Sequence, residues 1–341
     1  MQSAVGMSLR LLRSTRLTLA GFALLGAAVA VGQWQPQRVY WAVVFSLALL
    51  ALNLTAALVF SRELRRGGLG VFHLSLLGCL LLVAWGRLTH LDARIEIVDG
   101  QPFSPDAVQV VARGPMHSDS YRDLHFTQGP FTVDYAPGLR RQHTISKVAV
   151  GHAVGRQGQA PAQWQQVGDD HPLVLEGYRF YTTHNKGFAP ILSWIAPGAA
   201  ALTGAVHMPD YPGSDWKQEQ TWTPPAGPEM RFWLRQAKPV TQDEAWTLEP
   251  RKTDAVLVVE FDGRRFELRP GQEAVADRGV LRYEYLAGWM GYRIFYDPTL
   301  MPLLWLSVLG VVGMAVHLWS CVVAPRRRDV DARCAGRSGL A

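Results

Sequence analysis

Cysteine is scarce in this sequence and is absent from its long middle segment. The 341 residues contain three cysteines, Cys79, Cys321 and Cys334, and none lies between Leu88 and Pro298. We therefore expect the middle segment to fold without disulfides. The sequence also lacks a CxxC pair, which excludes a thioredoxin-like redox motif, and lacks CxxCH, which excludes a c-type cytochrome. We interpret Cys79 and Cys321 as small packing residues.

Charged side chains are missing from four long apolar runs, over residues 17–33, 39–60, 70–86 and 299–323. Each run is long enough to cross about 30 Å of hydrocarbon. The sequence therefore predicts membrane helices over 17–33, 39–60, 70–87 and 299–323, with 1–87 forming the N-terminus and first three spans, and 324–341 a tail. The first run also has the arginines and small residues of a signal peptide, but a second span follows it closely, which favours a helical hairpin.

The net charge of +6 is unevenly distributed. Residues 88–298 contain 21 Lys and Arg against 25 Asp and Glu, a net of −4, so the rest of the chain has +10. This excess reflects membrane topology and not a nucleic-acid surface. Basic residues flank the spans at Arg10, Arg13 and Arg16, at Arg62, Arg65 and Arg66, and at Arg326, Arg327 and Arg328. The positive-inside rule then predicts that both termini are cytoplasmic and that residues 88–298 are extracytoplasmic.

The 88–298 segment has the pattern of an all-β domain. Short β-branched or aromatic runs alternate with Gly, Pro and Asp turns. We expect a sandwich or open barrel of two lobes, joined by loops over residues 197–228. A repeated motif, Gly177–Tyr181 and Gly291–Tyr296, is consistent with one copy in each lobe. The predicted strands are 94–98, 107–111, 131–135, 145–150, 173–183, 255–261, 264–268, 280–285 and 292–296.

Three short motifs are informative together with the order of the segments. Phe72-His73-Leu74-Ser75 lies at the start of the third span, the Gly177–Tyr181 strand leads to Gly187-Phe188-Ala189-Pro190, and Asp297-Pro298 runs directly into the fourth span. With three spans, a large extracytoplasmic β domain and one last span, the whole chain resembles the ResB (CcsB) family of system II cytochrome c biogenesis proteins. The external domain is compact for that family.

The resemblance implies that the chain works in the inner membrane with a CcsA (ResC) type partner. Such a pair exports haem b, bound transiently, and presents it to the CxxCH thiols of apocytochrome c, where a thioredoxin-like reductant also acts. The partner family carries a tryptophan-rich WWD motif, which the dispersed tryptophans of this chain do not form. The chain alone also offers no evident catalytic acid, base or nucleophile, so we expect thioether formation to need the pair.

Two histidines, His73 and His317, lie within the predicted spans. His73 is about 4.5 Å from the cytoplasmic start of span three and His317 about 9 Å from the cytoplasmic end of span four, at roughly 1.5 Å per residue. Imidazole ligates haem iron, and the resemblance places the family's haem ligand at His73. His317 is a candidate by depth alone, and the antiparallel spans could bring the two together. Arg62, Arg65 and Arg66 are candidate propionate contacts as well as topological signals.

Other motifs give no site. The eight external histidines show no HxH or HxxxH spacing, so we predict no metal other than haem iron. Asp169-Asp170-His171 lacks a nucleophile elbow, and Gly67-Gly68-Leu69-Gly70 lacks the Lys-Ser/Thr of a phosphate loop. Three functions remain open. They are a haem-handling assembly factor, a structural subunit of a redox complex that does not bind haem, and a small-solute or ion transporter, against which the spans have almost no acids and no inverted pair of Gly- or Pro-broken helices.

Overall fold

The structure is a computed structural model, and it describes residues 14–335 apart from residues 33, 35–39, 152–162, 238–239 and 241. The chain forms two compact units. The helical unit contains residues 1–91, 112–118 and 297–341, and the β unit contains residues 92–111 and 119–296. Arg10 and Arg13, which precede the first predicted span, lie outside the described residues. Most of the turn between the first two spans also lies outside them.

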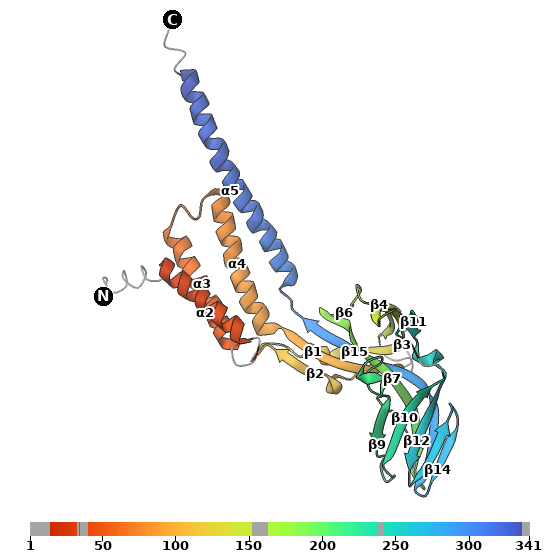
Figure 1. Cartoon of the computed structure of the whole chain (residues 1–341). Coiled ribbons are helices and arrows are strands. Elements are labelled where there is room, and N and C mark those ends of the chain that lie inside the picture. The colour runs from red at the N-terminus through yellow and green to blue at the C-terminus, as the bar shows by residue number, and fades with distance from the viewer. Residues whose placement is uncertain are drawn as a thin grey trace, which may run out of the picture. The chain divides into compact units, whose positions relative to one another are not determined.

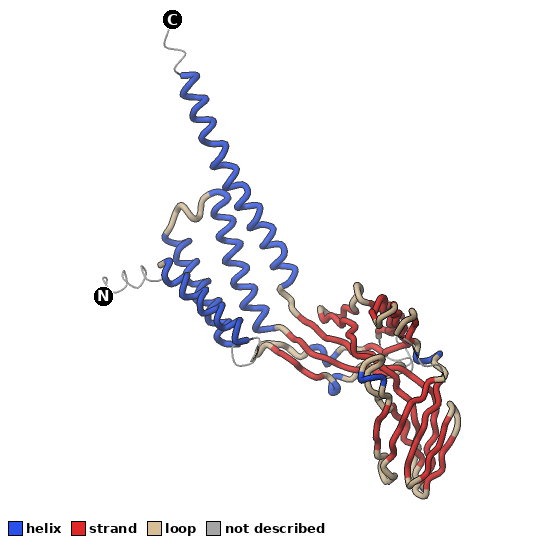
Figure 2. Tube along the Cα trace, viewed as in Figure 1, coloured by secondary structure: helices blue, strands red, loops and turns tan. Residues whose placement is uncertain are grey.

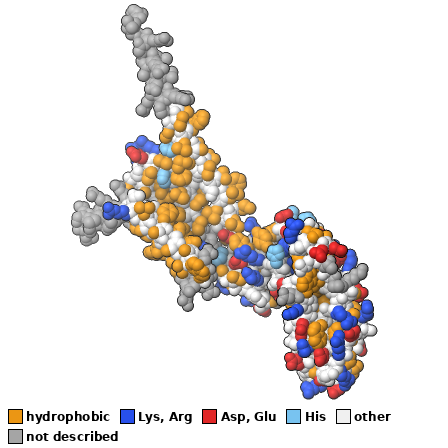
Figure 3. Space-filling view, in the orientation of Figure 1, with side chains coloured by type: hydrophobic (Ala, Val, Ile, Leu, Met, Phe, Trp, Pro, Cys, Tyr) orange, Lys and Arg blue, Asp and Glu red, His pale blue; other side chains and the backbone are white. Residues whose placement is uncertain are grey.

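The helical unit is a row of helices, each packed on the next along the chain (Figure 1). The helices are α2 (Thr15–Gly32), α3 (Tyr40–Phe60), α4 (Gly67–Thr89) and α5 (Leu300–Ala335). Within the described residues these four helices are long and apolar enough to cross a membrane. Their visible surface is largely hydrophobic, whereas charged side chains gather over the β unit (Figure 3). The sequence predicts that the last span ends at residue 323. The helical backbone of α5 continues beyond this point, through the arginines, to Ala335.

Glycines allow close approach between these helices. A Cβ at Gly21 of α2 would be 2.8 Å from Leu50 of α3, and one at Gly78 of α4 would be 2.7 Å from Leu306 of α5. Small residues are common where apolar helices pack in a membrane, because dispersion contacts drive that association. A polar contact adds to the first pair, where the Thr18 hydroxyl donates to the Asn53 amide oxygen at 2.8 Å.

The β unit consists of strands in three antiparallel sheets and does not form a closed barrel. Within the described residues its helical segments are short 3-10 turns only (Figure 2). A seven-stranded sheet contains β1 (Leu91–Val98), β2 (Gln109–Arg113), β6 (Leu173–Leu175), β7 (Tyr178–Ile195), β8 (Leu202–Ala205), β14 (Glu273–Ala276) and β15 (Gly279–Tyr296). The β3–β4 sheet contains β3 (Phe126–Ala136), β4 (Arg140–Val150), β5 (Gln163–Gly168) and β11 (Trp246–Leu248). The β10–β12 sheet contains β9 (Glu219–Trp222), β10 (Met230–Gln236), β12 (Ala255–Phe261) and β13 (Arg264–Leu268).

The long pair of β7 and β15 is central to the β unit. The two repeated motifs lie side by side in this pair, with Phe180 opposite Ile294 and Tyr181 opposite Arg293. They therefore do not belong to separate lobes, as the repeat had suggested. The prediction of one strand over 173–183 was also wrong, because Glu176 and Gly177 both have positive φ and form a two-residue turn between β6 and β7.

A buried polar contact connects two of the sheets. The Tyr292 hydroxyl of β15 donates to the Gln128 side-chain oxygen of β3 at 2.7 Å and lies 2.8 Å from the Ser146 hydroxyl of β4. All three side chains are buried, so their polar groups need such partners. Residues 197–228, predicted as loops, contain the short strands β8 and β9 between loops.

Candidate functional site

His73 lies on α4 and is held in one orientation by its own helix. Its Nδ1 is 2.8 Å from the Leu69 carbonyl oxygen, which can only accept a hydrogen bond, so Nδ1 carries the proton. The Nε2 atom therefore keeps its lone pair. Metal-bound histidines commonly donate their second nitrogen to a carbonyl in this way. The imidazole is half-buried and meets the Phe72 ring edge-on at 5.3 Å between centroids.

The face of α4 that carries His73 is the face that packs on α3. Leu80 and Ala84 pack against a cluster that includes Val43 and Leu47 of α3. His73 precedes Leu80 by seven residues and Ala84 by eleven, which at 3.6 residues per turn puts all three on one side of the helix. His73 therefore lies on the α3 side of α4, about 10 Å along the axis from Leu80.

The opposite face of α4 packs on α5. A Cβ at Gly68 would be 2.3 Å from the Gly313 oxygen and 2.7 Å from the His317 nitrogen, and one at Gly310 would be 3.2 Å from Ser75. Because His73 is two residues, about 200°, from both Val71 and Ser75 on this α5 side, it points away from α5. The structure thus does not bring His73 and His317 to a shared site, as the antiparallel spans had suggested.

His317 has a different environment. Its backbone packs on α4, and its Nε2 is 3.9 Å from Sγ of Cys321, one turn further along α5. Cys79 instead contacts the neighbouring helix, with its Sγ 4.0 Å from the Ser307 hydroxyl of α5. Both cysteines are free thiols. Cys79 contacts a polar group across the interface of α4 and α5, and Cys321 contacts one on its own helix.

Arg62, Arg65 and Arg66 form the exposed segment between α3 and α4. Arg66 is the N-cap residue of α4, two turns before His73, so its position continues the face that carries the histidine. No acidic side chain among the described residues forms an ion pair with any of the three. Three exposed guanidinium groups close to one end of that face are suited to anionic oxygens such as propionates.

The histidines outside the spans do not combine into a site. No group of three His, Cys, Asp or Glu side chains in the described part of the chain could hold a metal ion. His117 is buried and its Nδ1 donates to the Thr89 carbonyl at 2.8 Å, while His207 stacks on Trp289 and lies 3.8 Å from Glu96. His152 lies outside the described residues. The other external histidines are His90, His125, His143, His171 and His184.

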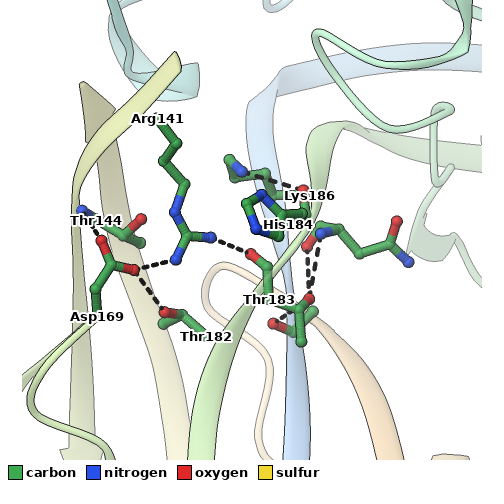
Figure 4. A network of polar contacts seen from close by, with 9 residues as sticks. Arg141, Thr144, Asp169, Thr182, Thr183, His184 and Lys186 are labelled. Atoms are coloured by element: carbon green, nitrogen blue, oxygen red, sulfur yellow. Dashed lines mark hydrogen bonds and ion pairs between the residues drawn. The ribbon is translucent and has the colours of Figure 1, made fainter. Parts of the chain in front are cut away.

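Sequence reasoning missed a buried cationic network in the β unit (Figure 4). The register of β7 and β15 shifts at a bulge, where the three residues 183–185 of β7 lie opposite the single residue Gly291 of β15. Arg141 donates to the freed Thr183 carbonyl at 2.8 Å and pairs with Asp169, and the Lys186 ammonium donates to the His184 carbonyl at 3.1 Å. Lys186 is 1% exposed, and this burial, with the Arg141 charge, lowers its pKa to about 8. No motif signals this lysine, because a bulge depends on strand register.

A protein-family comparison matches residues 61–328 to the model of the ResB-like family. The match covers most of the 341 residues. The chain belongs to the ResB-like family. No curated protein matches the chain. As a ResB-like protein, the chain has a role in cytochrome c biogenesis or a related complex, and the match contains both His73 and His317.

Proposed function

We propose that this ResB-like chain is a membrane subunit of system II cytochrome c maturation. With a CcsA (ResC) type partner it would move haem b across the inner membrane and present it for covalent attachment to apocytochrome c. Both termini would be cytoplasmic and the β unit extracytoplasmic, in agreement with the arginine distribution. The chain alone would not be an enzyme, and a thioredoxin-like reductant would keep the apocytochrome thiols reduced.

The observation that carries this proposal is the state of His73. Its Nδ1–H is engaged by the Leu69 carbonyl, so Nε2 is available as an axial ligand for a haem that is cargo and not a resident cofactor. The helix α4 that carries His73 is apolar in composition, which suits the porphyrin face. Arg62, Arg65 and Arg66 lie at the cytoplasmic end of α4 in the proposed topology, where haem propionates would meet guanidinium donors.

The proposal is tested by reconstituting maturation. The chain and a CcsA-type partner are expressed in a host that lacks its own cytochrome c maturation genes, with a soluble cytochrome c as reporter. Haem-stained gels should show covalent cytochrome c only when both proteins are present, and much less with His73→Ala. Unchanged maturation with His73→Ala would contradict the haem role and favour a structural subunit. No cytochrome c from any combination would contradict the proposed function itself.

A further inference from the structure

The β unit contains a cleft of about 420 Å³ at the open edge of β11. We call it the β11 cleft. Residues 246–249 line it consecutively, and the end of β10 and the segment after the turn η4 (Pro250–Lys252) close it. Its lining residues are Phe188, Tyr211, Gln236, Ala237, Val240, Trp246, Thr247, Leu248, Glu249, Lys252, Thr253 and Asp254.

The strand β11 is the edge of its sheet. It pairs with β3 on one side, with Trp246 opposite Tyr135 and Leu248 opposite Val133. On its other side no strand of the described part of the chain pairs with it. Outward-pointing N–H and C=O groups on such an edge can accept another extended strand. The cleft therefore runs along backbone donors and acceptors that can form hydrogen bonds with another polypeptide chain.

The wall of the β11 cleft is aromatic and firmly packed. Trp246 stacks on Tyr135 with 4.5 Å between centroids and meets Tyr211 edge-on at 5.8 Å. Tyr211 and Phe188 are only 4% and 1% exposed, so neighbouring groups hold them in place. The buried indole N–H of Trp246 has no hydrogen-bond acceptor among the described residues. A buried donor without a partner is unfavourable.

Charge at the rim is largely compensated. Lys252 pairs with Glu249 at 3.0 Å, and Asp254 pairs with Arg269 at 3.4 Å. The cleft therefore offers aromatic contact and backbone hydrogen bonds more than a net charge. These features favour an uncharged apolar side chain on an extended backbone over an anionic ligand.

We propose that the β11 cleft binds an extended polypeptide segment. The segment adds a strand to the free edge of β11 and places an aromatic or aliphatic side chain against Phe188, Tyr211 and Trp246. Binding of this kind requires a client that is unfolded, at least locally, where it meets the cleft. The inference rests on the proposed function only for the identity of the client, which would then be an apocytochrome.

The test measures peptide binding to the full-length protein in detergent. The probe is a fluorescein-labelled 11-residue peptide in which Leu or Trp alternates with Thr, Ser or Lys, and fluorescence anisotropy gives its Kd. A second peptide has the same sequence with N-methyl groups on alternate residues, which prevents strand pairing. Ala237→Trp fills the cleft from an exposed lining position, and Val174→Trp changes an exposed position on β6 as a matched control.

The wild type should bind the first peptide, and N-methylation or Ala237→Trp should each weaken binding by about tenfold or more, with Val174→Trp within about twofold. No binding, equal binding of both peptides, or unchanged binding by Ala237→Trp would overturn the proposal. A dimer of wild type that Ala237→Trp dissociates would also overturn it and make a second copy the occupant. Haem content is measured in the same samples, so that loss of haem binding and loss of peptide binding are distinguished.

Discussion

Gly68 of α4 lies directly against His317 of α5, so that a Cβ at Gly68 would be 2.7 Å from the His317 backbone nitrogen. This contact fixes the side of α4 that faces α5. His73, five residues further along, lies on the other side with Leu80 and Ala84. The two histidines within the spans thus have separate surroundings, and a haem role for each needs its own test.

We expect Gly68→Leu to separate α4 from α5 and destabilise the helical unit. A side chain at this position would meet backbone atoms of Gly313 and His317, which cannot rotate away. Overpacking of this kind costs roughly 1–3 kcal/mol. Thermal unfolding in detergent measures the effect. Gly26→Leu in α2 is the matched control, because nothing lies within 4 Å of a Cβ there, and equal melting temperatures for both variants would contradict the packing described.

Replacing Arg62, Arg65 and Arg66 together with lysine separates topology from haem contact. The positive charge that orients the spans is kept, but each guanidinium fork is lost. We expect normal membrane insertion and a haem dissociation rate raised by about fivefold, because bidentate hydrogen bonds to propionates are lost. Stopped-flow transfer of haem to apomyoglobin measures this rate. An unchanged rate would assign these arginines to topology alone.

The stability of the β unit should depend on Lys186 above pH 8. Burial lowers the pKa of Lys186 to about 8 in the folded chain, whereas the unfolded chain retains this proton to about pH 10.5. Unfolding between these pH values takes up a proton, so the free energy of unfolding rises with pH by at most about 1.4 kcal/mol per unit. Arg141, Asp169, His184, Tyr135 and Asp210 are the titratable or charged groups around this ammonium.

Urea unfolding of the full-length protein, followed by tryptophan fluorescence between about pH 8 and 9.5, tests this dependence. Higher pH is avoided because burial raises the pKa of Tyr135 to about 12 in the folded chain. Above about pH 10 this tyrosine would ionise in the unfolded chain only, which would lower the free energy of unfolding and mask the effect of Lys186. Lys186→Met should flatten the rise, and the exposed Lys217→Met should keep it. Equal slopes for wild type and Lys186→Met would show that Lys186 does not titrate in this range.

Asp99 and Arg251 form an ion pair whose carboxylate is buried. Arg251 donates from Nε and Nη2 to the two Asp99 oxygens at 2.5 and 2.8 Å, and the Asp99 side chain is 2% exposed. Arg251→Met should cost roughly 1–3 kcal/mol, because it leaves a buried carboxylate without its partner. Arg264→Met, which removes an exposed pair with Asp277, should cost under about 1 kcal/mol.

The loss in Arg251→Met should also depend on pH. Burial already raises the pKa of Asp99, and the arginine partly offsets this. Without Arg251 the folded chain would take up the proton at a higher pH than the unfolded chain does, so stability should recover as pH falls from 7 to 5. Urea unfolding at both pH values measures this. A loss that is as large at pH 5 as at pH 7 would contradict a charged, unpartnered Asp99.

Much of the architecture could be predicted from the sequence because its signals are local. The charge-free runs predicted the four helices. Runs of β-branched and aromatic residues between Gly-containing turns predicted β12 and β13 with the observed bounds, Ala255–Phe261 and Arg264–Leu268. Short edge strands such as β5 and β11 were missed, because their residues have weak strand patterns and are defined by pairing. The long β15 was split in two, because Gly288 and Gly291 read as breaks but lie inside the strand.

The candidate site was only partly predictable. The residue type and depth of His73 are visible in the sequence, but its orientation depends on which neighbours α4 packs against. The glycines at 67, 68 and 70 match no phosphate-loop motif, and only the structure shows that Gly68 is a tight packing position against α5. The bulge that buries Lys186 and the edge that opens the β11 cleft both arise from strand register, which a single sequence does not determine.

The haem role of His73 is tested most directly by the haem content of the protein purified in detergent after co-expression with a CcsA-type partner. Absorption spectra with pyridine haemochrome quantification compare wild type, His73→Ala and His317→Ala. We expect near-stoichiometric b-type haem in wild type and His317→Ala, and its loss in His73→Ala. Haem retained in His73→Ala, or absent from every preparation, would contradict this role.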